Sequence, residues 1–189
     1  MDAGNATAVE RLMSAFQEAG CRPPVLVLGA EAEALRRRLP EGVAERCLRL
    51  VVNTQWEAGR TGSLQAGLAA AADAAGEASD FLIAPVDHPF VAAGTIREML
   101  GALENGRASG ARVVIPVHGG RSGHPVLCDG RLRGEFSRLR AGEPASRVTS
   151  RIPGRVLRLA TEDPAVLDDL DTPADLQRAR ARVAAGAVR

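Results

Sequence analysis

Two groups of carboxylates occupy positions in the sequence where strands are expected to end. Asp87 follows the apolar run 81–86, which is short and bounded by polar residues, as expected of a buried strand in a parallel sheet. A second acidic cluster, residues 168–171, closes the last extended region of the chain. Open α/β sheets bind their ligands beyond the carboxyl ends of the strands. Because no cysteine or histidine cluster accompanies these carboxylates, they favour a hard, oxygen-liganded cation, with Mg²⁺ carrying a phosphate as the leading interpretation.

The composition limits the classes of function. A chain of 189 residues suits one domain with a single core, and 46% hydrophobic with 25% charged residues is ordinary for a soluble protein. The net charge of +1 and the low aromatic content of 3% do not favour nucleic acid as a partner. All 24 basic residues are arginines, so any mechanism that needs a lysine is excluded.

The cysteines and the amino terminus predict a cytoplasmic protein without a membrane partner. Cys21, Cys47 and Cys128 are odd in number and widely spaced, which favours reduced structural thiols over a disulfide or zinc pattern. Residues 1–5 show no basic segment leading into an apolar one, so no signal peptide is expected. No apolar stretch approaches the roughly 20 residues that cross a bilayer.

Hydrophobic periodicity and turn residues predict an alternation of strands and helices. Helices are expected at 7–20, 31–39, 63–75, around 96–103, at 131–140 and 145–151, and from 173 onward. Strands are expected at 25–29, 48–53, 81–86, 112–117, 126–128 and 155–159. This order predicts an α/β fold, a three-layer sandwich with a mainly parallel sheet, in one domain spanning residues 1–189.

Five stretches carry a resemblance to a known family. Residues 27–33 form a strand and turn, and residues 53–64 follow the pattern Asn-x-x-Trp-x-x-Gly-x-x-x-Ser-Leu. Residues 85–89 contain Asp-x-Pro, residues 123–127 read Gly-His-Pro-Val-Leu, and residues 169–173 read Asp-Leu-Asp-Thr-Pro. In order and spacing, this set resembles the MobA-like nucleotidyltransferases, and within them the molybdenum cofactor cytidylyltransferase branch.

The resemblance implies a nucleotide-diphospho-sugar transferase-like fold and transfer of CMP or GMP from CTP or GTP to a phosphorylated acceptor such as molybdopterin, with release of pyrophosphate. It also implies Mg²⁺ as cofactor, with Asp87 as the principal ligand and Asp171 or Asp169 as the second. From the residues alone, the alternative for Asp87 is a turn or N-cap residue before Pro89, and the segment at Asp171 is also an ordinary capping sequence.

Other candidate binding residues lie in two loops. Gly59, Gly62 and Ser63 could direct backbone N–H groups and a helix amino terminus toward a nucleotide or an anionic acceptor; the alternative is a plain loop in which Ser63 caps the helix. His124, which the resemblance places on the acceptor side, could bind phosphate or donate a hydrogen bond, or could be a turn histidine. His88 is interpreted as structural or exposed.

The sequence departs from the family at its start. The family opens with a strand and a Gly-rich loop, Leu-Ala-Ala-Gly-x-Ser-x-Arg-Met-Gly-x-x-Lys, and no segment here matches it. We therefore expect a domain that is truncated at its amino terminus relative to the family and lacks the first strand. Three interpretations stay open: a fragment of an active enzyme, an inactive homologue that binds or regulates a partner, and a fold completed by a protein partner or by self-association.

Overall fold

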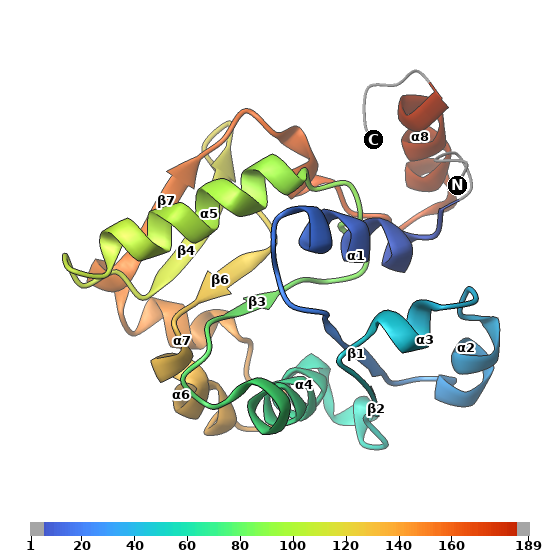
Figure 1. Ribbon diagram of the computed structural model, residues 1–189, viewed down its shortest axis with the longest axis horizontal. Helices are drawn as coiled ribbons and strands as arrows, with labels where there is room; N and C mark the ends of the chain where they lie inside the picture. The colour runs from blue at the N-terminus through green and yellow to red at the C-terminus, as the bar shows by residue number, and fades with distance from the viewer. Residues whose placement is uncertain (1–5, 185–189) are drawn as a thin grey trace.

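The computed structural model describes residues 6–184, and their side chains as far as residue 181. The α-helices are α1 Ala8–Glu18, α2 Ala32–Arg38, α3 Val43–Arg46, α4 Arg60–Ala75, α5 Ala93–Gly106, α6 Arg133–Ser137, α7 Ser146–Ser150 and α8 Pro173–Ala184. The strands are β1 Val25–Leu28, β2 Arg49–Val52, β3 Phe81–Ile83, β4 Val113–His118, β5 Arg121–Ser122, β6 Val126–Cys128 and β7 Val156–Ala160. Strands and helices alternate along most of the chain (Figure 1), which confirms the predicted α/β class.

The larger sheet of the structure is mixed, so the expectation of a mainly parallel sheet is corrected. β1 pairs with β2 and β4 pairs with β7 in parallel, whereas β6 lies antiparallel between β3 and β4. The physical reason is the connection between β4 and β6, which runs through the short strand β5 and contains no helix. A parallel pair needs a long crossover, and this short return allows only antiparallel pairing.

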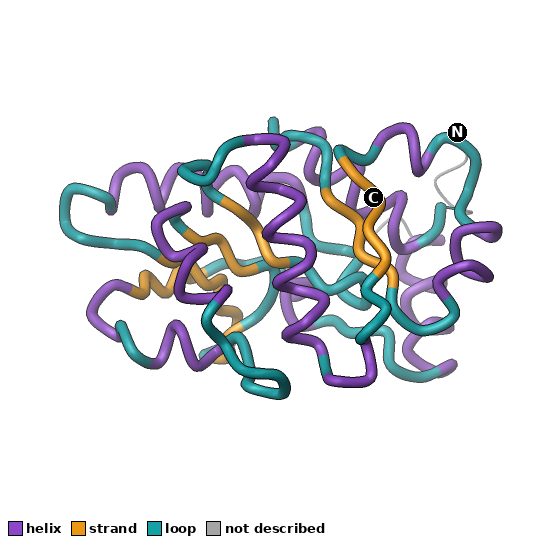
Figure 2. The backbone as a smooth tube through the Cα atoms, turned by 90° about the horizontal axis from the view of Figure 1, so that it is seen from below, coloured by secondary structure: helices purple, strands orange, loops and turns teal. Residues whose placement is uncertain are grey.

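The strands fall into two groups. β1 and β2 form a sheet of their own, and the other strands form the second sheet, with β3 at its edge. Figure 2 shows the two groups separated along the molecule. Among residues 6–184, no strand pairs with both β1 and β3.

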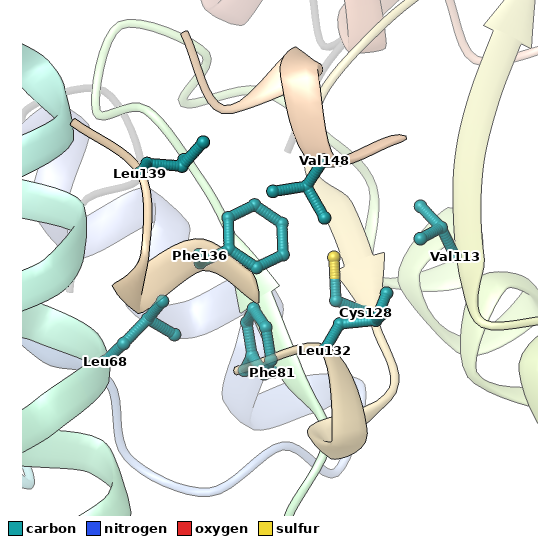
Figure 3. Packing of buried hydrophobic residues seen from close by; sticks show 8 residues of the cluster. All are labelled: Leu68, Phe81, Val113, Cys128, Leu132, Phe136, Leu139 and Val148. Carbon is teal, nitrogen blue, oxygen red and sulfur yellow. The ribbon is translucent and has the colours of Figure 1, made fainter. Parts of the chain in front are cut away.

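Helices cover both faces of the larger sheet because side chains of β3 alternate in direction. Phe81 packs with Phe136 and Leu68 in the cluster formed with α4, α6 and α7 (Figure 3), and the rings of Phe81 and Phe136 meet edge to face at 5.6 Å. Leu82 faces the opposite side, where it packs against residues of α1 and α5 such as Leu12 and Met99. β3 is therefore buried on both of its faces.

Charged groups hold the start of β3. Asp129, 2% exposed, accepts a hydrogen bond at 2.8 Å from Arg107, which also pairs with Asp80 directly before β3. The Gly130 N–H donates to Asp80 at 3.1 Å. These contacts tie β3 to the segment that follows β6. None of the described helices combines the length and the apolar character needed to cross a membrane.

Candidate functional site

Asp87 lies in the turn between β3 and α5, four residues after the strand ends. Its backbone carbonyl accepts a hydrogen bond at 2.9 Å from the N–H of Leu170, so the two acidic segments predicted at strand ends lie side by side. Its side chain is 37% exposed, yet its Oδ1 atom is buried and has no hydrogen-bond partner among the described residues. A buried carboxylate oxygen without a partner is costly, which suits a ligand at this position.

Two imidazoles stand beside this carboxylate. The rings of His88 and His124 have centroids 4.8 Å apart, and His88 Nε2 lies 3.9 Å from Asp87 Oδ1. The Nδ1 atoms of both histidines are buried without a hydrogen-bond partner in the described part of the chain. The interpretation of His88 as structural or exposed therefore missed its place in the site. Its position directly after Asp87, within the 85–89 motif, is the signal that could have indicated it.

Burial shapes the charge of His124. Burial lowers the pKa of His124 below its usual value, and the nearby His88 lowers it further. The charge of Asp87 raises the pKa of His124, whereas the charge of Arg60 lowers it. His124 therefore favours the neutral imidazole, which can donate or accept one hydrogen bond at each nitrogen but carries no charge.

The backbone before His124 is locked against the segment after β7. The N–H of His124 donates to the carbonyl of Val166 at 2.8 Å, and the N–H of Gly123 donates to the carbonyl of Pro116 at 2.8 Å. A Cβ atom at Gly123 would lie 2.3 Å from the Val166 carbonyl oxygen, so only glycine fits. The Gly-His-Pro motif thus uses its glycine for close backbone approach and presents the histidine to Asp87.

Gly62 and Ser63 lie in the first turn of α4, which begins at Arg60, and Gly59 directly precedes the helix. Gly59 is the N-cap residue at φ +109°, a conformation that favours glycine, and no side chain caps this helix end. Ser63 therefore lies inside the first turn, and the expectation that it caps the helix is wrong. Its Oγ accepts a hydrogen bond at 3.0 Å from Asn53, and no side chain among the described residues caps the backbone N–H groups at this helix end.

Asp171 is exposed and lies just before α8. Thr172 and Asp175 form the cap of α8. The Thr172 N–H donates to the Asp175 carboxylate at 2.7 Å, and the Asp175 N–H donates to the Thr172 hydroxyl oxygen at 3.2 Å. Within residues 6–184, no group of three or more histidine, cysteine or acidic side chains is arranged to hold a metal ion. The buried Oδ1 of Asp87, which accepts no hydrogen bond from the described residues, is compatible with a cation ligand, and the metal roles of Asp87 and Asp171 both stay predictions.

Comparison with known proteins supports the same family. The sequence matches the MobA-like NTP transferase domain over residues 1–156. That match contains the segments 27–33, 53–64, 85–89 and 123–127, whereas 169–173 lies beyond it. Nicotine blue oxidoreductase of Paenarthrobacter nicotinovorans is 31% identical over 181 residues, which cover 91% of this chain and 82% of that protein.

Solved structures share the fold. The Mycobacterium tuberculosis H37Rv protein Rv0371c, crystallised in complex with manganese, has a TM-score of 0.70 at 23% identity, covering 92% of this chain and 86% of that one. A nucleotidyl transferase of Methanothermobacter thermautotroptrophicus has a TM-score of 0.73 at 21% identity, covering 96% of this chain and 82% of that one. At these identities, the two structures establish likeness of fold.

Proposed function

The chain belongs to the MobA-like NTP transferase domain family, and on that premise we propose that it transfers CMP or GMP from CTP or GTP to a phosphorylated acceptor, releasing pyrophosphate. The observation that carries the proposal is the Asp87 carboxylate in the turn after β3, which has one buried oxygen without a hydrogen-bond partner among the described residues. The acidic segment 168–171 lies beside it through the Leu170 hydrogen bond. Asp87 is the group best placed to hold a divalent cation beside the phosphates.

The proposed chemistry depends on charge and position. Attack on an α-phosphate requires neutralisation of the phosphate charge and in-line alignment more than covalent participation by the protein. Mg²⁺, when bound, would supply that neutralisation, with Asp87 as its principal ligand and Asp171 as the second. The manganese complex of the structurally similar Rv0371c supports a divalent cation in this fold.

The remaining site residues act on the two substrates. The amino terminus of α4, with Gly59, Gly62 and Ser63 in its first turns and Arg60 beside them, offers N–H donors and positive charge to a phosphate. His124, neutral through burial, would donate a hydrogen bond to the acceptor. Molybdopterin is the proposed acceptor from the resemblance of the motifs at 53–64 and 123–127.

Product analysis tests this proposal. We would incubate the protein with CTP or GTP, Mg²⁺ and molybdopterin, then measure pyrophosphate and the nucleotidylated acceptor by mass spectrometry. The proposal predicts equal amounts of the two products with one nucleotide preferred. Absence of both NTP binding and turnover would reject catalysis by this chain, and the interpretation as a partner-binding homologue would then take its place.

A further inference from the structure

Trp56 is the only tryptophan of the chain, and it lies on the surface of the protein. It begins the short 3₁₀ segment Trp56–Ala58 that leads into α4, and it is 42% exposed. Tryptophans are on average well buried in folded proteins. No aromatic ring or guanidinium group among the described side chains stacks on its indole. Part of the indole is therefore open to a ligand, and the chemistry proposed above gives it no role.

The backbone before Trp56 is fixed by Asn53, a residue that directly follows β2 and is only 8% exposed. The Asn53 N–H donates to the Leu28 carbonyl at 2.8 Å, and its Nδ2 donates to the Ser63 hydroxyl at 3.0 Å. Its Oδ1 accepts a hydrogen bond from the N–H of Gln55 at 3.0 Å. One side chain thus joins β1, β2, the turn at Trp56 and α4, so a ligand that binds there has little backbone motion to restrict.

The side chain of Trp56 begins against Gly29, which directly follows β1. A Cβ atom at Gly29 would lie 3.0 Å from the Cβ atom of Trp56 and 3.5 Å from its Cγ atom. Because β1 and β2 pair in parallel, their carboxyl ends meet at this edge of the smaller sheet. Open α/β sheets bind their ligands beyond the carboxyl ends of the strands. Trp56 therefore lies at an edge where a ligand is expected.

The start of α4 connects this edge with the carboxylate of the candidate site. Leu64, near the start of α4, packs against the same apolar cluster as Ile83, the last residue of β3. Asp87 follows Ile83 by four residues. The charge of Arg60, the first residue of α4, also reaches His124, whose pKa it lowers. Trp56 precedes Arg60 by four residues and therefore borders the site.

We propose that Trp56 is the stacking surface for the nucleobase of the NTP. The identity of this ligand depends on the proposed function. A nucleotide carries its base one ribose away from its phosphates, so one molecule can contact Trp56 with its base and the first turn of α4 with its phosphates. Every base offers a π-face to an indole, whatever its hydrogen-bonding pattern. Trp56 would therefore bind CTP and GTP alike, and the choice between the two bases rests with other groups.

The fluorescence of Trp56 reports directly on this contact, because the chain has one tryptophan and no tyrosine. We would titrate the protein, with Mg²⁺ present, with CTP, GTP and inorganic tripolyphosphate, which has the phosphate chain without a base. The inference predicts that both nucleotides quench the fluorescence, after correction for their own absorption, and that tripolyphosphate leaves it unchanged. Equal quenching by tripolyphosphate would show that the phosphates alone change the signal and would overturn the inference.

Calorimetric titration then measures the affinity of the same three ligands for variants of Trp56. We expect Trp56→Ala to bind each nucleotide about tenfold more weakly or worse, and tripolyphosphate as the wild type does, because only the base loses its contact. Trp56→Phe keeps a smaller ring and should restore most of the affinity. Leu35→Ala removes a similarly exposed apolar side chain from α2, and this matched control should bind all three ligands as the wild type does.

The outcomes separate this inference from the proposed function. Nucleotide binding that depends on Trp56, without release of pyrophosphate, would reject catalysis and support the stacking site. Turnover with unchanged nucleotide affinity in folded Trp56→Ala would reject the stacking site alone. Absence of CTP and GTP binding to the wild type would reject both.

Discussion

Gly123 lies where two backbone segments of the candidate site approach each other closely. Because a Cβ at this position would lie 2.3 Å from the Val166 carbonyl oxygen, Gly123→Ala must push apart two segments that carry the site. We expect a loss of at least about 2 kcal/mol in the free energy of unfolding, measured by urea denaturation. Gly101→Ala on α5, where no atom lies within 4 Å, is the control and should leave stability unchanged or raise it.

An unchanged stability of Gly123→Ala would contradict the close approach of these segments.

Some residues of the candidate site could be predicted from the sequence. The Gly-His-Pro motif identified His124, and Asp87 was identified by its place after an apolar run. The contact between His88 and His124 could not be predicted, because it depends on β6 pairing with β3 in antiparallel register, which brings together residues 36 positions apart.

The burial of β6 predicts how the stability of the protein depends on pH. Its last residue, Cys128, is fully buried between β3 and β4, and this burial, with the charges of Asp80 and Asp129, raises the pKa of its thiol from 9.0 to about 12. A raised pKa means that the folded state disfavours the thiolate. The stability that Cys128 contributes is therefore fully present below pH 9 and is lost as the pH rises toward 12.

We expect the free energy of unfolding to fall between pH 9 and 11, by up to about 1.4 kcal/mol per pH unit for this group. The chain has neither lysine nor tyrosine, so few other side chains titrate in this window. Urea denaturation of the wild type and of Cys128→Ala at each pH measures the difference. A slope that persists unchanged in Cys128→Ala would show that the thiol is not its source.

Element positions were largely predictable from the sequence, whereas their pairing was not. The apolar run 81–86 indicated β3, and the glycine turn at 119–123 indicated the return to β6. The direction of β6 depends on the short connection after β4, so the mixed sheet could be recognised only in three dimensions. The start of α4 at Arg60, in place of Ser63, shows that a well-placed serine does not set a helix end when a glycine upstream can do so.

The motifs in the sequence predicted the MobA-like family, which the match over residues 1–156 confirms, and the fold brings the predicted acidic segments side by side. The two sheets, the helices on both faces and the acidic segments beside β3 together place Asp87 at the edge where a ligand can reach it. We predict that Asp87 holds a divalent cation during nucleotidyl transfer, and substitution of this one carboxylate tests that role.

The measurement is the Mg²⁺-dependent release of pyrophosphate from CTP and GTP, with molybdopterin present as the acceptor, by the wild type, Asp87→Asn and Asp73→Asn. Asp73 is an exposed aspartate on α4 that lies outside the site and serves as the control. We predict that Asp87→Asn lowers the rate at least about a hundredfold, since loss of one group that stabilises transition-state charge typically has this effect, and that Asp73→Asn does not. Full activity in folded Asp87→Asn would contradict the role of Asp87 as the ligand of the divalent cation.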